Sequence, residues 1–259
     1  MTAYKIPEKS KSKKIAAIFA AIVIVILALF FFRNQSSQKI TINPVGTTAD
    51  VYIDETKKSS LPATRAKTYR VSGSDSQVLV ASSNHYPWTE TVSVQPGEEV
   101  TLTPFLLART PETTRNVPEN ITADLKTSPS VPTSTDALVS DSGNTTVFVD
   151  PENRSNIIAR WTDEPASAPD FYDCFEGTCG VSVYNNQPVR QLAFYPGRSD
   201  AVIFATDSAV YAIEIDPSGT QNAQIVAEDI TNPVFAIDEK NSRIFVTSPE
   251  SQPVITKEL

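Results

Sequence analysis

The sequence is poor in the residues from which most catalytic and metal centres are built. It holds one histidine, His85, and two cysteines, Cys174 and Cys179. Structural zinc usually needs four Cys or His ligands, and a single histidine supplies a Ser–His or Cys–His catalytic pair poorly. No glycine-rich phosphate loop, H-E-x-x-H motif or EF-hand spacing occurs. We therefore expect no enzyme activity, no metal and no cofactor, and we interpret His85 as part of a turn.

Basic residues are outnumbered by acidic ones, which gives a formal net charge of −8 and a pI near 4.8. This balance argues against nucleic acid, or an anionic membrane surface, as the partner of the acidic part. The acids are scattered, so solubility is their default role. Two neighbouring pairs, Asp163 with Glu164 and Asp170 with Asp173, are the remaining candidates for catalytic carboxylates, although such pairs are common in loops.

One stretch, Ile15–Phe32, has no charge, hydroxyl, glycine or proline in eighteen residues. As a helix it would be about 27 Å long, close to the thickness of a bilayer's hydrocarbon core. A core helix would carry a polar stripe, and a signal peptide would end at small residues, but this stretch has neither. We expect an uncleaved transmembrane anchor in the lipid bilayer, with cleavage as the main alternative.

The charges that flank this stretch predict its orientation. Residues 1–14 hold five lysines and one glutamate, whereas residues 33–259 hold 17 basic and 29 acidic groups. Basic flanks stay on the cytoplasmic side of a membrane. We therefore expect a single-pass protein of the cell membrane, with a cytoplasmic tail at 1–14 and extracytoplasmic domains after Arg33.

Residues 39–106 carry the pattern of an antiparallel β-domain. Short runs rich in Val, Ile, Thr and Tyr alternate with turn-forming residues, and none has helical periodicity. Six strands that bury one face each are enough for a small β-sandwich. The predicted strands are 39–43, 50–54, 68–72, 77–81, 89–95 and 99–105.

Turn motifs in this region follow a recognisable order. They run from Val51-Tyr52-Ile53-Asp54 through Leu61-Pro62-Ala63-Thr64 and His85-Tyr86-Pro87-Trp88 to Gln95-Pro96-Gly97-Glu98. In this order the region resembles the PEGA domain of bacterial surface proteins. The resemblance implies a small extracytoplasmic β-module with no enzyme activity attached to it.

The chain departs from the family pattern at three turns. Glu55 stands where the family has a turn glycine, Pro62 is not preceded by threonine, and Asn84-His85 replaces the glycine before the tyrosine. The family's glycines are what its tight turns need, so these are the positions at which the resemblance is weakest.

Residues 108–137 have a different amino-acid composition. They contain four prolines, are dense in Thr and Ser, and have little apolar content. Such a segment buries too little surface to offset the entropy lost on ordering, so we predict a linker between two domains.

Residues 138–259 return to β-patterning and contain an internal repeat. Phe194–Thr206 aligns without gaps on Phe235–Thr247, at an offset of 41 residues. This period is typical of β-propeller blades, but only about two and a half blades fit, fewer than closure needs. We interpret the region as a β-meander or partial propeller, with chance similarity in an unrelated sheet as the alternative. Its predicted strands are 145–149, 157–161, 181–184, 191–195, 201–206, 210–215, 224–227, 234–237, 243–247 and 253–257.

Cys174 and Cys179 lie on the predicted outer side, where disulfides form and persist. The four residues between them include Gly177 and can turn, so we predict a disulfide that contributes about 2 kcal/mol. A metal site or free thiols are the alternatives.

Large aromatic residues lie beside predicted loops in both domains. Such residues either stack on sugar or peptide ligands or close the ends of a β-core. The candidates for ligand binding are Tyr86, Trp88, Trp161, Phe171 and Tyr172.

The predicted fold class is mainly β: an N-terminal transmembrane helix, a small antiparallel PEGA-like β-sandwich, and a β-meander or partial propeller. The expected function is a non-catalytic, membrane-anchored binding or structural protein of the cell envelope, which holds a cell-wall polymer or an envelope protein. The alternative is an accessory or sensor subunit of an envelope complex. The predicted segments are 1–14 (tail), 15–32 (anchor), 39–106, 108–137 (linker) and 138–259.

The orientation can be tested by protease treatment of intact cells that carry an epitope after Leu259. We expect the epitope to be lost without lysis, because the positive flank retains the N-terminus inside. A fully protected epitope would contradict the predicted topology.

Overall fold

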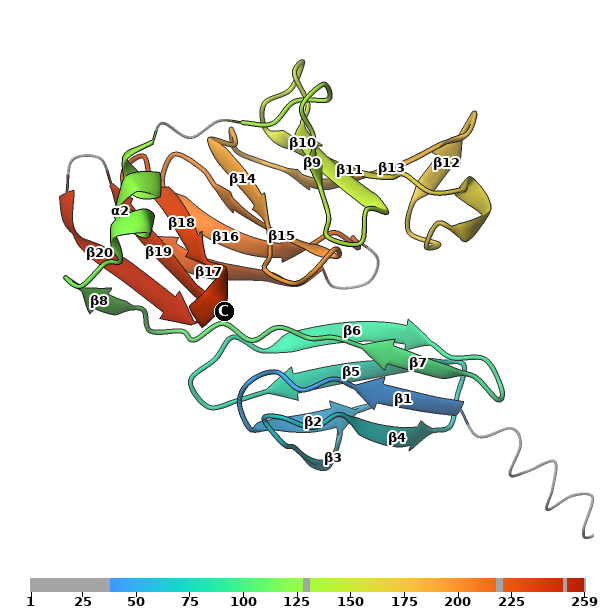
Figure 1. Cartoon of the computed structure of the whole chain (residues 1–259). Helices are drawn as coiled ribbons and strands as arrows, with labels where there is room; N and C mark the ends of the chain where they lie inside the picture. Colours follow the sequence, from blue (N-terminus) through green and yellow to red (C-terminus); the bar gives the residue numbers. More distant parts are fainter. Residues whose placement is uncertain (1–37, 128–130, 218–220, 249–250, 259) are drawn as a thin grey trace, which may run out of the picture.

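The computed structural model describes residues 38–127, 131–217, 221–248 and 251–258. The predicted tail 1–14 and anchor Ile15–Phe32 lie outside these residues. Within the described ranges, none of the helical segments combines the length and the apolar character that a membrane crossing requires. The described chain is mainly β, as predicted, and its sheets are largely antiparallel (Figure 1).

Residues 38–107, here called the first module, form two sheets that enclose one core. One has the order β3-β2-β5-β6 and the other β4-β1-β7. Inward side chains from both sheets, such as Ile40, Val51 and Val80, are fully buried. All six predicted strands are present. The strands are β1 (Gln38–Ile42), β2 (Ala49–Ile53), β3 (Thr56–Leu61), β4 (Lys67–Val71), β5 (Asp75–Ala81), β6 (Trp88–Ser93) and β7 (Glu99–Leu102).

The first module differs from the prediction in two respects. Strands β1 and β7 pair in parallel, with Ile40 opposite Val100, so a purely antiparallel arrangement was the wrong expectation. Strand β3 was not predicted, because TKKSSL is polar and mostly exposed. The β2–β3 turn places Asp54 and Glu55 at φ 51° and 62°, so Glu55 adopts the left-handed backbone for which the resembled family uses glycine.

Three further sheets form the C-terminal part, here called the sheet stack. Their orders are β12-β13-β11-β10-β9, β14-β15-β16-β17 and β18-β19-β20-β8. The ten predicted strands are all present, and β8, β9 and β12 are additional. The strands are β8 (Glu112–Thr114), β9 (Leu138–Val139), β10 (Thr145–Val149), β11 (Asn156–Trp161), β12 (Asp173–Phe175), β13 (Thr178–Asn185), β14 (Gln191–Phe194), β15 (Ala201–Ala205), β16 (Ala209–Glu214), β17 (Ala223–Glu228), β18 (Val234–Asp238), β19 (Arg243–Ser248) and β20 (Ser251–Glu258).

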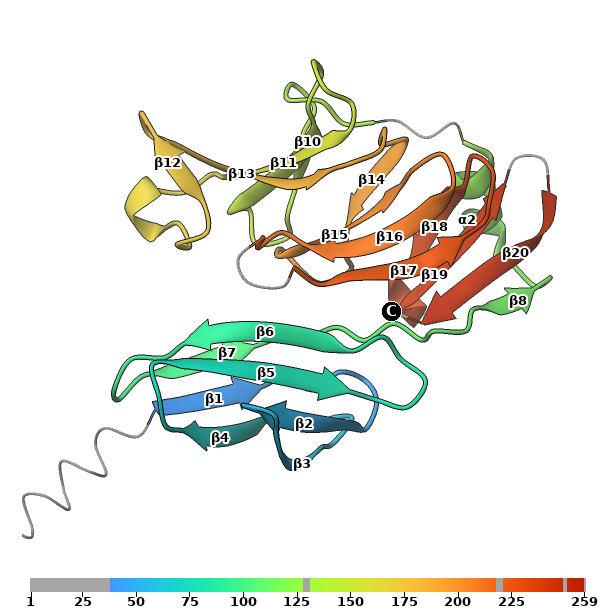
Figure 2. The same ribbon diagram turned by 180° about the vertical axis from the view of Figure 1, so that it is seen from behind.

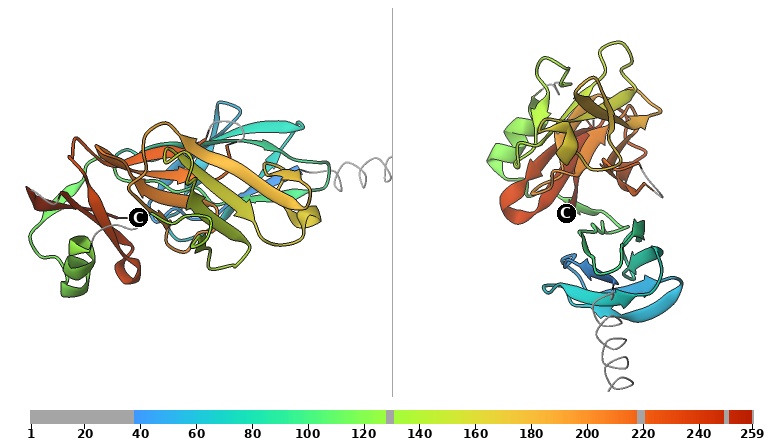
Figure 3. Two further views of the ribbon diagram at one scale, coloured as in Figure 1. Left: turned by 90° about the horizontal axis from the view of Figure 1, so that it is seen from above. Right: turned by 90° about the vertical axis from the view of Figure 1, so that its right-hand side faces the viewer.

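The sheets of the stack pack as successive layers, as Figures 1 and 2 show from opposite sides. Val149, Ile157 and Phe204 belong to the core between the first two sheets. Ile203 and Val246 belong to the core between the second and third. That second core continues into the first module, which lies along one side of the stack (Figure 3).

Part of the predicted linker is ordered, contrary to the expectation for 108–137. Strand β8 pairs with β20 and completes the third sheet. Helix α2 (Glu119–Lys126) covers that sheet's outer face, where Ile121 packs with Phe245 and Val254. Ile121 and Leu125 are one helical turn apart, and this short apolar stripe gains its stability from the sheet beneath it.

The internal repeat falls at equivalent places in two sheets, because its copies contain β14 with β15 and β18 with β19. The strand register does not follow the alignment. Phe194 pairs with Val202, but its counterpart Phe235 pairs with Val246 rather than with Arg243. The second hairpin is shorter, because Asp238 already pairs with Arg243.

If α2 stabilises the third sheet by covering it, loss of its buried side chain should destabilise the protein. Ile121 is 1% exposed, so Ile121→Ala should lower the free energy of unfolding by about 2–4 kcal/mol through lost burial and a cavity. Asp124→Ala, an exposed change in the same helix, should stay within about 0.5 kcal/mol. Urea unfolding of both variants gives the comparison, and equal stabilities would contradict the role of α2.

Candidate functional site

The first module and the stack meet at a buried polar contact, here called the seam. Trp88 of β6 donates its indole Nε1–H to Oε1 of Glu214 on β16 at 2.7 Å. Both side chains are buried, with Trp88 2% and Glu214 6% exposed. A buried carboxylate needs partners, and Glu214 has a second donor in Nδ2 of Asn222 at 2.6 Å. The tryptophan thus joins the modules through a charge-assisted hydrogen bond.

Two side-chain amides extend the seam. They form hydrogen bonds with backbone groups of the first module, as the backbone of a paired strand would. Asn222 accepts from the backbone N–H of Thr89 and donates to its carbonyl, both at 2.8 Å. Gln224 accepts from the N–H of Leu107 at 2.7 Å and donates to the carbonyl of Phe105 at 2.8 Å. Each amide therefore satisfies one donor and one acceptor of the first module's backbone. Removing either amide would leave buried backbone groups without partners.

Arg198 closes the seam at its rim. Its guanidinium pairs with Asp200 at 2.8 Å, approaches Glu214 at 3.5 Å and donates to the carbonyl of Thr103. The same group lies 5.4 Å from the ring centroid of Phe105, which in turn packs against Tyr195 at 5.3 Å. One arginine from the β14–β15 turn thus contacts a backbone carbonyl and an aromatic ring of the first module, and two carboxylates of the stack.

Burial at the seam raises the pKa of two carboxyl groups. Desolvation raises the pKa of Glu214, although hydrogen bonds from Trp88 and Asn222 oppose this. Desolvation, with added repulsion from Glu214 and Asp216, raises the pKa of Glu90 to about 8. The seam therefore contains two carboxyl groups that burial makes harder to ionise.

A second contact between the two parts of the protein places cationic side chains beside the ring of Tyr86. The Lys257 ammonium lies 5.3 Å from its ring centroid, and the Arg109 guanidinium lies 5.9 Å away. Lys257 is 4% exposed and donates to the carbonyl of Ile225 at 2.6 Å. Burial lowers its pKa to about 8. Tyr86 therefore has two cationic neighbours, one of them from the last strand of the stack.

The predicted disulfide is confirmed. Cys174 on β12 and Cys179 on β13 are directly paired across the hairpin, with a Cα–Cα distance of 4.0 Å. The turn residues Glu176 and Gly177 have φ 48° and 80°, the combination that matches the twist of a two-residue hairpin. Of the large apolar side chains in the described ranges, Phe175 beside this turn is the most exposed, at 76%.

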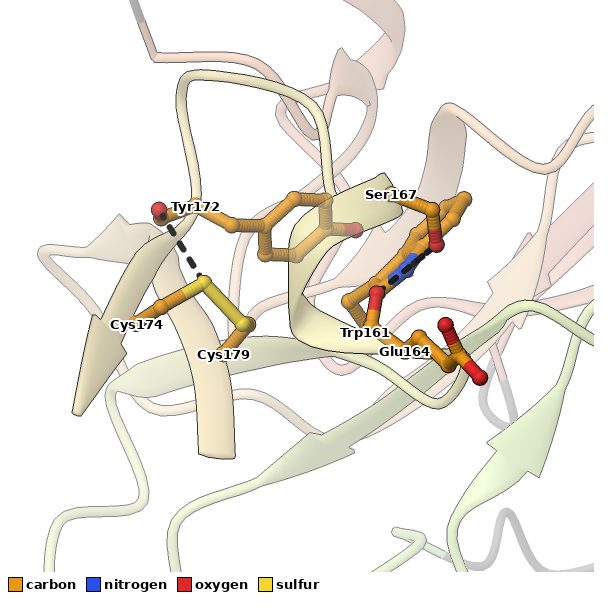
Figure 4. The surroundings of a disulfide bond; sticks show 6 residues. All are labelled: Trp161, Glu164, Ser167, Tyr172, Cys174 and Cys179. Atoms are coloured by element: carbon orange, nitrogen blue, oxygen red, sulfur yellow. Dashed lines mark hydrogen bonds between the residues drawn. A yellow bond between two sulfur atoms is a disulfide. The ribbon is translucent and has the colours of Figure 1, made fainter. Parts of the chain in front are cut away.

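Aromatic residues hold the base of this hairpin (Figure 4). Tyr172 packs against Trp161 with ring centroids 5.9 Å apart and against Phe171 at 4.6 Å. The indole of Trp161 donates to Oγ of Ser167 at 3.3 Å, and Ser167 donates to the carbonyl of Glu164 at 2.7 Å. These contacts fasten the 162–172 loop to β11.

The aromatic residues chosen from the sequence occupy three environments. Trp88 is buried in the seam, and Tyr172 is buried beneath the disulfide hairpin. Tyr86, Trp161 and Phe171 are half-buried and surrounded by protein groups. The acidic pairs at 163–164 and at 170 and 173 are exposed. His85 closes a turn, in which its backbone N–H donates to the carbonyl of Ser82 at 3.2 Å.

Sequence reasoning missed the polar residues of the seam. Glu214 ends β16, Asn222 directly precedes β17 and Gln224 lies within it, and each is less than 10% exposed beside apolar neighbours. A polar residue at an inward position of a strand is the signal that could have found them, since such a residue must have a partner. Its partner cannot be read locally, because Trp88 and Glu214 are 126 residues apart in the chain.

The sequence matches no family model and no curated protein. The resemblance to PEGA domains therefore stays a prediction. Within the described ranges, no group of three or more His, Cys, Asp or Glu side chains is placed to hold a metal ion.

Glu90 makes the stability of the seam depend on pH. Its folded pKa of about 8 lies above the ordinary 4.5, so the folded state holds this proton more tightly. The corresponding stability is present below pH 4.5 and is lost as the pH rises to 8. Glu90→Gln should therefore raise the free energy of unfolding at pH 8.5 by roughly 1–2 kcal/mol, and change it little at pH 4.5.

Urea unfolding at the two pH values measures this difference. The exposed Glu152→Gln serves as the control, and it should be neutral at both. A gain from Glu90→Gln that is equal at both pH values would contradict the titration at the seam.

Proposed function

We propose that this protein is a non-catalytic binding or structural protein of the cell envelope, anchored in the membrane by Ile15–Phe32. On this proposal the N-terminus is cytoplasmic and the described β-structure is extracytoplasmic. The apolar run and its basic flank support this orientation. The Cys174–Cys179 disulfide supports an oxidising compartment, because such bonds persist outside the cytoplasm.

The finer assignment of the two parts belongs to the same proposal. The first module is a PEGA-like β-sandwich, supported by its two facing sheets and the order of its turns. The stack is a partial propeller, supported by successive sheets of four or five strands, each largely a meander. Helix α2 then acts as the terminal cap that an open array of sheets requires.

The seam is the observation that carries the proposed function. It joins the first module to the stack through buried hydrogen bonds and a shared apolar core, so both parts form one body. Only a few residues separate the proposed anchor from β1, which begins at Gln38. A rigid body so close to the membrane is suited to holding a wall polymer or an envelope protein at a fixed place.

One observation favours the alternative, an accessory or sensor subunit of an envelope complex. Glu90 lies at the boundary between the two parts, where burial raises its pKa to about 8. A change of external pH through this value would alter the charge of the seam, and the tether would carry the response to the lysine-rich tail.

A pull-down with tagged protein of residues 38–259 tests the proposed function. Purified wall material and detergent-solubilised membrane extract serve as the two samples. Retention on the polymer supports binding to the wall, and recovery of one stoichiometric protein complex supports the accessory role. Glu214→Ala, which breaks the seam, should reduce retention more than the exposed Glu152→Ala. Turnover of an envelope substrate would contradict both functions.

A further inference from the structure

The strongest unassigned feature of the surface is the tip of the disulfide hairpin. Phe175 is 76% exposed, although an aromatic side chain of this size normally lies in a core or at an interface. In the views of Figures 1 and 2 the β12 hairpin lies at the periphery, away from the first module and the other two sheets of the stack. Phe175 therefore contributes little to the fold.

We propose that the β12–β13 hairpin is the docking element for a protein partner, which offers an apolar pocket for Phe175 rimmed by lysine or arginine side chains. This inference rests on the proposed function as an extracytoplasmic binding protein. It adds the place of contact and the chemistry of the partner.

The two faces of the hairpin differ in the way that docking requires. Cys174 and Cys179 are a directly opposed pair, and Cys179 is 1% exposed against the core. Since side chains alternate along a strand, the neighbouring pairs, Phe175 with Thr178 and Asp173 with Gly180, lie on the opposite face. Cys179 thus holds the disulfide face of β13 against the protein, whereas all three residues of β12, Cys174 included, are exposed, and the face with Phe175 is presented outward.

The tip is also pre-organised. The Glu176–Gly177 turn closes the hairpin in the minimum number of residues, and the disulfide joins the strands one position behind Phe175. Tyr172 and Trp161 fix the base of the hairpin (Figure 4). An anchor residue that is already ordered loses little conformational entropy on binding, which raises affinity.

Charge decides the kind of partner. From residue 161 to residue 189 the chain has five acidic residues and no lysine or arginine. Two of the acids, Asp173 and Glu176, flank Phe175, and both are exposed. An anionic lipid surface would be repelled by these carboxylates, whereas a basic protein surface would be attracted. The observations therefore favour a protein partner over insertion of Phe175 into the bilayer.

Site-specific photo-cross-linking of the full-length protein in membranes of the source cells tests the inference. The photoreactive residue p-benzoylphenylalanine replaces Phe175, and in a matched control it replaces Val139, which is also apolar and 60% exposed. We expect one discrete protein adduct from position 175 and none from position 139. Mass spectrometry should place the cross-link in a partner peptide that contains lysine or arginine.

A second part of the experiment, the charge arm, removes the two flanking carboxylates by the double change Asp173→Asn with Glu176→Gln. These changes preserve the size of both side chains and the two-residue turn. The double change should reduce the adduct by about five-fold or more, because the flanking carboxylates are lost, whereas Asp141→Asn, an exposed control, should leave it unchanged. Resistance of the cysteines to thiol labelling shows that the hairpin is intact in each variant.

Several outcomes would overturn the inference. These are no adduct at position 175, an equal adduct at position 139, a lipid adduct, or a protein adduct that the charge arm leaves unchanged. Protease accessibility of the C-terminal epitope in the same cells separates this failure from failure of the proposed function. An accessible epitope without the expected adduct refutes only the docking site, whereas a protected epitope refutes the extracytoplasmic placement itself.

Discussion

The hydrogen bond from the Trp88 indole to Glu214 is the contact on which the architecture depends. It places a buried carboxylate between two β-structures, and such a group is stable only while its donors stay in position. Asn222 and Gln224 add the same constraint, because each completes backbone hydrogen bonds of the first module. The seam therefore specifies one relative placement of the two parts, and the apolar core that they share adds the burial energy.

The sheet stack extends outward from this contact and ends in different ways on its two sides. On one side, strand β8 and helix α2 complete and cover the third sheet with residues that precede the stack in the chain. On the other, the β12–β13 hairpin leaves the first sheet and exposes Phe175. The body is thus fixed at the seam, covered at one end and exposes an aromatic tip at the other.

Strand positions were predictable because alternation of apolar residues is a local signal. The strands that were missed, such as β3 and β8, are polar and mostly exposed, and they owe their structure to a neighbouring strand. Helix α2 was missed because prolines and threonines surround Ile121, whose burial partners are more than a hundred residues away. The disulfide was predictable from two cysteines in one short turn. The seam was not predictable, because the sequence near Trp88 resembles a loop and gives no sign of its distant partner Glu214.

Hydrogen exchange of the two tryptophan indoles tests the seam most directly, since the chain contains only Trp88 and Trp161. Trp88 is 2% exposed and bonded to buried Glu214, whereas Trp161 is half-buried and bonded to Ser167. We predict that the Trp88 indole N–H exchanges only through unfolding, much more slowly than that of Trp161. If both exchange at the same fast rate, the first module and the stack are separate bodies, and the account is wrong.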